Sequence, residues 1–469
     1  MTDPQPAPVR LSDTELRALG HRVVDLIADH WKSVAAAPPI RVGNPGELRN
    51  RLEEPAPEDP MPLDDVIDVV MSDVLPFVQH GDHPRFFARI PGPSNPVGVF
   101  ADALAAGLNV FVGSWTGGSG PATVELVTLG WLRDLFGLPP GTEGAFVSGG
   151  SVATLNALAA ARAHVLLPDQ HGRAVAYLSD QTHASCARAL RTLGFGDEQI
   201  RVLPTGPDLR LQAPAVASAV AADRAQGRRP FCVIATAGST NTGAVDPLPA
   251  LADLCGAESL WLHVDAAYGG PAVLCEAGRA LLAGVERADS IAVDPHKWLF
   301  QPYECGVVLV RHEGALPAAF ALHPEYLADV AGRTAEVNFF DRGVQLTRGF
   351  RALKLWMTIK VFGLAAMRSG IEHGIRTAER AEELLRSAGW EIETPAQLGI
   401  VSFRRGDDAE RHLRTVTEMQ ADGVAAISST LLHGVTVLRM CTINPATTIA
   451  DLEATVAALE RAWTRSASA

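Results

Sequence analysis

Short apolar stretches alternate with amphipathic stretches between about residues 86 and 365. Each apolar stretch is short enough to be a strand, and apolar enough along its length to be buried on both faces. Helical patterns such as 154–166 and 250–257 separate most of them. This alternation predicts an α/β fold with a mostly parallel sheet covered by helices. The predicted strands are 144–150, 174–180, 231–238, 260–267, 290–297 and 306–311.

Two helical patterns joined by a proline-rich stretch precede this region. Residues 11–31 carry apolar side chains at helical spacing, and Ser12 and Glu15 have the spacing of a capping box. The proline-rich stretch, 38–62, predicts an extended connector, and the residues after it predict a second helix. Helices outside a main domain commonly wrap a neighbouring chain. We therefore expect residues 1–85 to form an N-terminal helical segment that wraps a partner subunit in a homodimer.

The pattern changes past residue 365, where shorter alternating elements follow. They predict a small α+β C-terminal domain over 366–469, after a large domain over 86–365. The predicted elements of the small domain are helix 375–389, strand 400–405, helix 407–423, strand 434–443 and helix 450–463.

Charge and composition narrow the class of protein. The net charge of −13 and the lack of any Lys/Arg cluster argue against a nucleic-acid partner. No run of about 18 apolar residues is present, so no membrane span is expected. The N-terminus lacks the pattern of a secretory signal, and we expect a cytoplasmic protein. The 6 cysteines are scattered and indicate neither a disulfide framework nor a zinc site, so no metal is expected.

Lysine is rare in this chain, which shortens the search for a catalytic amine. Lys32, Lys354 and Lys360 fall in helical patterns, where a lysine is normally a solvated surface charge. Lys297 instead ends the predicted strand 290–297, and burial there would favour its neutral, nucleophilic form. The simpler interpretation is a lysine that reaches water at a strand end. The residue pattern alone leaves both interpretations open.

Asp265 also ends an apolar strand, in the stretch LWLHVDAAYGG. A carboxylate is costly to bury there unless it has a cationic partner, and a pyridinium nitrogen would be one. The alternative is a helix cap, because small residues follow. The stretch from Asp265 to Lys297 fits one strand–helix–strand unit, so both side chains could reach the same site.

A Ser-Gly-Gly-Ser sequence, 148–151, lies between an apolar strand and a helical pattern. Free amides at a helix N-terminus, with glycines that permit close approach, can hold a phosphate. Ordinary strand–helix turns use the same residues, so this signal is weak by itself. The absence of a GxGxxG sequence argues against a dinucleotide.

Other polar residues follow predicted strands in the same way. His183, in SDQTHAS, could stack on a planar ring or act as an acid or base. Thr236 and Ser239, in ATAGST, could donate hydrogen bonds to a cofactor. Each is more often an ordinary loop or strand-end residue. Their joint placement with a lysine, an aspartate and a phosphate loop is what a phosphate-bearing aldehyde cofactor needs.

These motifs resemble the group II pyridoxal-phosphate (PLP)-dependent decarboxylases, most closely over residues 82–365. The resemblance implies the fold-type I PLP-dependent transferase fold, with PLP as cofactor. It also implies an L-amino-acid decarboxylase that acts on an aromatic or bulky substrate through a Schiff base with Lys297 and a quinonoid intermediate. The segments that carry it are HPRFF (83–87), SDQTHAS (179–185), HVDAAY (263–268), DPHKW (294–298), PYECG (302–306) and RGFRALKLW (348–356).

The same resemblance implies a role for each matching residue. Lys297 would bind the cofactor aldehyde, Asp265 would pair with the pyridine nitrogen, and His183 would stack over the ring. Tyr326 falls in the mobile loop that carries a tyrosine in the family, which is thought to protonate the carbanion. The remaining cofactor contacts would be Gly149, Gly150 and Ser151 at the phosphate with His296 and Asp294, Ala267 at the ring face, and Thr236 nearby.

The sequence departs from the family pattern where the substrate is expected. Arg89 and Ile90, followed by Pro91 and Gly92, occupy the place of an aromatic pair, and Gly113 stands where another aromatic side chain is usual. Residues 89–91 are the expected substrate contacts, and an altered substrate is implied. Arg89 would either meet a carboxylate or phosphate of that substrate or simply be solvated. The alternative function is a diverted outcome in natural-product biosynthesis, either oxidative deamination to an aldehyde or C–S β-elimination. A cofactor-free interaction protein is disfavoured because Lys297 is intact.

Overall fold

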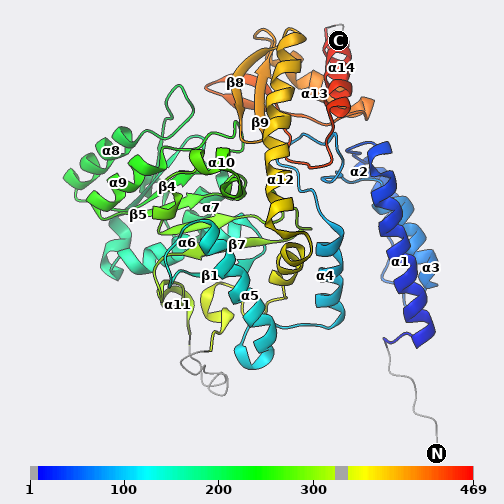
Figure 1. Ribbon diagram of the computed structural model, residues 1–469, viewed down its shortest axis with the longest axis horizontal. Coiled ribbons are helices and arrows are strands. Elements are labelled where there is room, and N and C mark those ends of the chain that lie inside the picture. The colour runs from blue at the N-terminus through cyan, green and yellow to red at the C-terminus, as the bar shows by residue number, and fades with distance from the viewer. Residues whose placement is uncertain (1–8, 323–335, 468–469) are drawn as a thin grey trace, which may run out of the picture.

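The computed structural model describes residues 9–322 and 336–467 (Figure 1). Its main sheet has seven strands in the order β1-β7-β6-β5-β4-β2-β3. β3, β2, β4, β5 and β6 pair in parallel, whereas β7 is antiparallel to both β6 and β1. This is the predicted α/β fold with a mostly parallel sheet. The strands are β1 (Glu143–Val147), β2 (Ala174–Ser179), β3 (Ile200–Leu203), β4 (Arg229–Thr236), β5 (Trp261–Asp265), β6 (Ser290–Val293) and β7 (Gly306–Val310).

The helices that follow these strands bury the sheet. α6 lies against β4, β5, β6 and β7, and it can approach closely because its buried face includes Ala153, Ala157 and Ala160. α8 and α9 pack on β4, and α5 packs on β1. The helices of this region are α4 (Pro96–Gly107), α5 (Trp115–Leu135), α6 (Gly150–Val165), α7 (Ala184–Thr192), α8 (Ala213–Ala225), α9 (Leu248–Glu258), α10 (Glu276–Leu281) and α11 (Ala315–Phe320).

The C-terminal part contains a separate antiparallel sheet in the order β10-β11-β9-β8, flanked by α13 and α14 (Figure 1). The long helix α12 runs from the main sheet to this part, and Gly363 interrupts its helical conformation with a φ of 75°. The proposed domain boundary at 365 lies just past that glycine. The elements are α12 (Ala352–Ser387), β8 (Glu391–Gln397), β9 (Ile400–Arg404), α13 (Ala409–Asp422), β10 (Ser428–Leu432), β11 (Val435–Cys441) and α14 (Ile449–Arg465).

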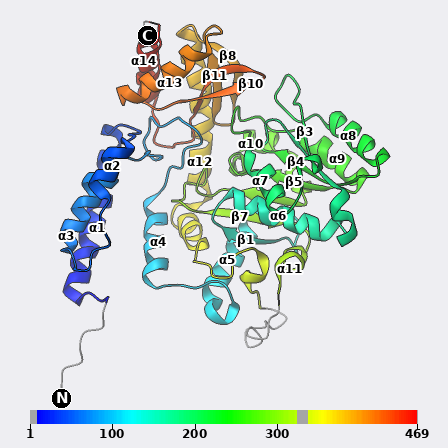
Figure 2. The same ribbon diagram turned by 180° about the vertical axis from the view of Figure 1, so that it is seen from behind.

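The N-terminal helices lie along one side of the molecule in both views (Figures 1 and 2). α1 (Asp13–Ser33) begins with the predicted Ser12–Glu15 capping box. The extended connector predicted over 38–62 is wrong in part, because it contains α2 (Pro45–Leu52). The side chain of Asn44 caps the first amides of α2, and a proline at the first position needs no amide partner.

The second predicted N-terminal helix is α3 (Leu63–Val69), which continues as a π-helical turn over Val70–Val74. No helix in the described parts of the chain has the length and apolar character needed to cross a membrane.

Candidate active site

A cavity of about 350 Å³ opens at the carboxyl ends of the central strands. Thr236 ends β4, Asp265 ends β5, and Asp294 directly follows β6. Ligands of open α/β sheets bind at this edge, and the volume lies in the usual range of roughly 300–1,000 Å³ for small-molecule sites. The cavity is lined by Ser148, Gly149, Gly150, Ser151, Val152, His183, Ser185, Thr236, Gly238, Thr240, Asp265, Ala267, Tyr268, Asp294, His296, Lys297 and Glu304.

Lys297 forms an ion pair with Asp294 in this cavity, with Nζ 2.8 Å from Oδ2. Burial alone would lower the pKa of the amine, but the attraction of Asp294, and then that of Asp265, outweighs it. The pKa of Lys297 is therefore raised. The expectation that burial favours the neutral amine is corrected, because a buried carboxylate beside the amine favours its charged form. Lys297 becomes a nucleophile only when this proton leaves, and Asp294 is the adjacent base.

Asp265 is a buried carboxylate with few donors of its own. Its Oδ1 accepts a hydrogen bond from the Ala267 amide at 3.1 Å, and the Cys186 thiol donates toward Oδ2 at 3.6 Å. Burial, followed by the negative charge of Asp265, raises the pKa of Cys186, so the thiol keeps its proton. One amide and one weak thiol donor leave Asp265 able to bind a cation within the cavity.

The N-terminus of α6 enters the cavity through its glycines. A Cβ on Gly150 would lie 2.9 Å from Asp294 Oδ2 and 3.1 Å from Ala267 Cβ, so a larger residue would crowd both. The first amides of a helix have no intrahelical acceptor, and they attract anions. His296 lies beside them and accepts from the Cys305 amide through Nδ1 at 3.1 Å. Burial lowers the pKa of His296 and so favours the neutral ring. Because Nδ1 accepts a hydrogen bond, the neutral ring carries its proton on Nε2.

Two further polar groups complete the wall. The Ser185 amide donates to His183 Nδ1 at 3.3 Å, so a neutral His183 ring carries its proton on Nε2. Thr236 is buried, and its backbone amide donates to Asp246 at 2.7 Å. The Thr236 hydroxyl, in contrast, is buried without any partner in the described structure. A buried hydroxyl of this kind marks a position where a ligand group can bind.

Comparison with known proteins identifies the family. Residues 45–405 match the pyridoxal-dependent decarboxylase conserved domain. The chain belongs to the pyridoxal-dependent decarboxylase family. It is 46% identical to an aromatic-L-amino-acid decarboxylase of Bacillus atrophaeus, over 95% of this chain and 94% of that protein. It is also 34% identical to a phenylacetaldehyde synthase of Arabidopsis thaliana, over 92% of each protein.

The decarboxylase also shares its fold with solved relatives. The crystal structure of Oryza sativa TDC with PLP and tryptamine matches with a TM-score of 0.92 at 30% identity, covering 97% of this chain and 99% of that one. The protein is thus a PLP-dependent decarboxylase, as the resemblance implied.

The cavity of the decarboxylase fits PLP. It offers the helix N-terminus of α6 for an anion, a lysine for an aldehyde and the buried carboxylate of Asp265 for a ring nitrogen. Thr236 Oγ1 and Asp294 Oδ1 are both buried without a partner in the described structure, and a polar ligand could satisfy them. The glycine at position 150 also keeps this part of the cavity open, since a Cβ there would collide with Asp294.

The structure brings the predicted cofactor contacts of the decarboxylase together, and it separates the predicted substrate contacts from them. The hydroxyl of Ser239, which could have donated a hydrogen bond to a cofactor, is instead bonded to the hydroxyl of Thr242. The Arg89 guanidinium donates to Gln79 at 2.6 Å and is exposed. Tyr326 lies outside the described residues. Residues 89–91 do not line the cavity of the described chain, whereas His183, Gly149, Gly150, Ser151, Thr236, Asp265, Ala267, Asp294, His296 and Lys297 all do.

Sequence reasoning missed residues that only the tertiary fold brings near the site. Tyr268 lines the cavity and stacks on Trp298, with ring centroids 5.3 Å apart. Arg439, on β11, is buried and donates to the carbonyl oxygens of Arg89 and Asn241. Its Nη2 is buried without a partner in the described structure. Nothing in the local sequence of β11 distinguishes Arg439 from a surface arginine.

Proposed function

We propose that this decarboxylase converts an aromatic L-amino acid and a proton into the corresponding amine and carbon dioxide. The observation that carries the proposal is the meeting of Lys297, Asp265 and the α6 N-terminus in one cavity. The relative from Bacillus atrophaeus, named an aromatic-L-amino-acid decarboxylase, supports the substrate class.

Each polar group of the cavity has a proposed task. PLP, when bound, supplies the aldehyde and the electron sink for the reaction. Lys297 holds the cofactor covalently, and Asp294 accepts or returns the proton on Nζ from 2.8 Å away. The buried carboxylate of Asp265 would keep the pyridine nitrogen of the bound cofactor protonated, because a nearby negative charge favours the protonated ring. His183 stacks on the ring and directs its Nε2 proton away from Ser185.

The phosphate and the substrate have separate proposed contacts. The first amides of α6, Ser151 and His296 Nε2 hold the phosphate, and Thr236 donates its free hydroxyl nearby. Arg439 offers a buried Nη2, without a partner in the described structure, to the substrate carboxylate. It does not line the cavity itself, but it interacts electrostatically with Tyr268, which does. Tyr326 protonates the α-carbon after carbon dioxide leaves.

We further propose a homodimer in a reducing, cytoplasmic compartment. An apolar groove of about 720 Å³ lies along α1 and α3, and it includes Val66, Val70 and Met71, which are about two-fifths exposed. Neighbouring apolar side chains that are exposed together on a single chain favour burial by a second copy. All of the cysteines are free and buried, as is usual where thiols stay reduced.

Borohydride reduction of the holoenzyme tests the cofactor attachment. Peptide mass mapping should find the phosphopyridoxyl group on Lys297. Lys354 is the matched internal control, since it is also buried and ion-paired, with Asp102 at 2.6 Å. Lys297→Ala should fold and carry no reducible label. A label on Lys354, or none on the wild-type holoenzyme, would refute the proposed site.

Product analysis tests the reaction. Holoenzyme is incubated with L-tryptophan, L-tyrosine, L-phenylalanine, L-glutamate and L-histidine. Mass spectrometry identifies the products, and an oxygen electrode measures the consumption of oxygen. Equal amounts of amine and carbon dioxide from an aromatic substrate support decarboxylation. The similarity to a phenylacetaldehyde synthase makes the oxidative outcome the second candidate. That outcome would consume oxygen and water and yield aldehyde, carbon dioxide, ammonia and hydrogen peroxide.

A further inference from the structure

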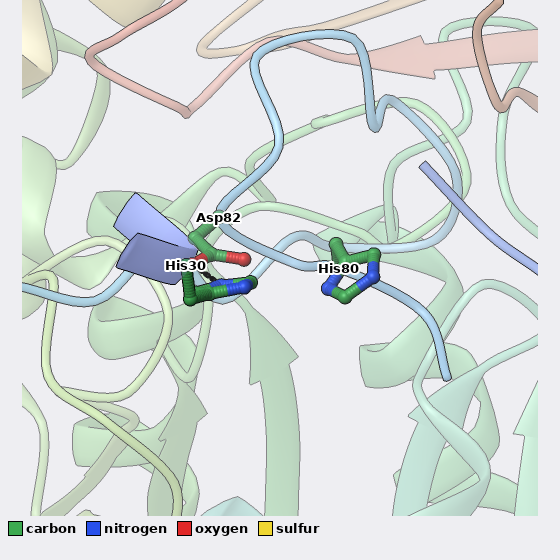
Figure 3. A group of neighbouring side chains, drawn as sticks. All are labelled: His30, His80 and Asp82. Atoms are coloured by element: carbon green, nitrogen blue, oxygen red, sulfur yellow. Dashed lines mark hydrogen bonds and ion pairs between the residues drawn. The ribbon is translucent and has the colours of Figure 1, made fainter. Parts of the chain in front are cut away.

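Three side chains with metal-binding groups lie together outside the cavity (Figure 3). His30 is in the last turn of α1, and His80 and Asp82 belong to the segment that follows α3. One ligand atom from each lies within 4.8 Å of the other two. His30 Nε2 is 2.9 Å from Asp82 Oδ2, and the two imidazole rings are 5.3 Å apart. In the described parts of the chain, this is the one group of three such residues that comes this close.

The backbone holds these residues in place. The His80 amide donates to the Pro39 carbonyl at 2.9 Å, and the His83 amide donates to the His80 carbonyl at 3.0 Å. The carbonyl of Asp82 accepts from the Asn444 side chain at 2.9 Å. The segment is therefore anchored to both the N-terminal and the C-terminal parts of the chain. The backbone bonds thus hold the three residues where their ligand atoms lie within 4.8 Å of one another.

The chemistry of the group suits zinc. Zn²⁺ is bound by imidazole nitrogen and carboxylate oxygen at about 2.0–2.2 Å, commonly with three protein ligands and a water. Ligand atoms of such a tetrahedral site are about 3.4 Å apart. The His30–Asp82 pair is already closer than this, and the third atom lies within 4.8 Å. His30, His80 and Asp82 also border the apolar groove along α1 and α3. In the single chain the side chains of His30 and Asp82 are 39% and 20% exposed, which leaves a fourth position open to a water.

We propose that His30, His80 and Asp82 bind one Zn²⁺, which joins α1 to the segment leading into the main domain. A simple ion pair between His30 and Asp82 would explain two of these residues without a metal. It leaves the position of His80 unexplained. The cysteine pattern of the chain offered no hint of this site, because its ligands come from separate elements.

Zinc binding is measured on holoenzyme that has been treated with chelator and saturated with PLP. After dialysis against Zn²⁺, elemental analysis should find one zinc per chain, and zinc should raise the midpoint temperature of unfolding. His80→Ala leaves the His30–Asp82 pair in place and should weaken zinc binding at least tenfold. His21→Ala is the matched control, because His21 is an exposed histidine on the same helix. It should bind zinc as the wild type does.

Several outcomes would overturn the proposal. A wild type that binds no stoichiometric zinc would refute the site. Unchanged zinc binding by His80→Ala would place the zinc elsewhere. Equal losses in His80→Ala and His21→Ala would show nonspecific binding. Circular dichroism establishes that each variant is folded, and Asp82→Asn provides a second ligand deletion of nearly the same size. Co²⁺ in place of Zn²⁺ should give visible absorption bands that disappear in both ligand variants.

Discussion

At the scale of single residues, the protonation of Lys297 depends on the carboxylates around it. Burial opposes the charged amine, whereas Asp294 and Asp265 favour it, and the pKa of Lys297 ends above its ordinary value. An amine with a raised pKa is mostly protonated at neutral pH. Attachment of the cofactor should therefore become faster as the pH rises toward this pKa. Asp294 sets the position of that rise, because it is the nearest acceptor of the Lys297 proton.

Asp294→Asn should move the pH dependence of cofactor attachment to lower pH. The variant removes the negative charge of Asp294, which is the main influence that raises the pKa of Lys297 against the effect of burial. The pKa of Lys297 should therefore fall. At neutral pH, apoenzyme of the variant should then attach PLP faster than wild-type apoenzyme. Stopped-flow absorbance between about pH 6 and pH 10, below the pKa of the wild-type lysine, compares the rates of PLP attachment of the two apoenzymes at each pH. Asp180→Asn is the control, since this exposed carboxylate directly follows β2 and accepts from Thr205. Equal attachment rates of Asp294→Asn and wild type at every pH contradict the assignment.

Arg439→Met should weaken substrate binding through loss of a charge-assisted hydrogen bond. Such a bond contributes roughly 1.5–3 kcal/mol, which corresponds to an increase in KM of about 10- to 150-fold. The amine product lacks a carboxylate, so its inhibition constant should stay within about twofold of wild type. Steady-state kinetics with both compounds separates this role from general damage to the site. If inhibition by the amine weakens as much as substrate binding, Arg439 acts on packing instead.

At the scale of elements, α6 depends on a small residue at its first position. Gly150 has no side chain between Asp294 and Ala267, and a Cβ would lie 2.9 Å and 3.1 Å from their atoms. Gly150→Ala should therefore crowd the phosphate site, at a cost of about 1–3 kcal/mol. The affinity for PLP should fall by roughly 5- to 150-fold, as measured by equilibrium dialysis.

The matched control for that helix change is Gly130→Ala in α5. No atom lies within 4 Å of a Cβ built at Gly130, so the alanine has open space. It should raise helix stability by up to about 1 kcal/mol and leave PLP affinity unchanged. Equal affinities of Gly150→Ala and wild type would show that the phosphate is held elsewhere.

The strands that the sequence predicted are those that are buried along most of their length. β4 and β5 are examples, and their bounds agree with the predicted 231–238 and 260–267 within a few residues. β3, β8 and β10 were missed, because all three lie at sheet edges and are only partly buried. Edge strands lack the continuous apolar pattern that identifies a central strand.

The cofactor side of the site was predictable for a similar reason. Each of its residues follows a buried strand, and parallel strands place their carboxyl ends at one edge. Arg439 takes its position from packing between distant parts of the chain, and no local pattern indicates such contacts. Tyr268 follows β5 as the other site residues follow their strands, but its contacts with Gly399 and Trp298 form only in the fold. The charge state of Lys297 was predicted in the wrong direction, because the ion pair with Asp294 forms only in the folded site.

At the scale of the whole molecule, α1 and α3 leave a line of apolar side chains uncovered. Val23, Val66, Val70 and Leu75 are each about two-fifths exposed and border one apolar groove. The same helices lie along one side of the main body in both views (Figures 1 and 2). A helix with an uncovered apolar face gains little stability alone, since most helix stability comes from packing. The second copy of the chain would supply that packing.

Val66→Asp combined with Val70→Asp should convert the proposed homodimer into a monomer. Two carboxylates in the groove would have to be desolvated if it were covered by a second chain, and that cost has no compensating partner. Light scattering coupled to size-exclusion chromatography measures the mass directly, for comparison with 49.7 kDa for one chain. Leu413→Asp is the control: Leu413 is 51% exposed on α13, away from the groove, and should leave the mass unchanged. A double variant that keeps the wild-type dimer mass would place the subunit contact on another surface. A monomeric wild type would contradict the proposal that a second copy of the chain covers the apolar groove.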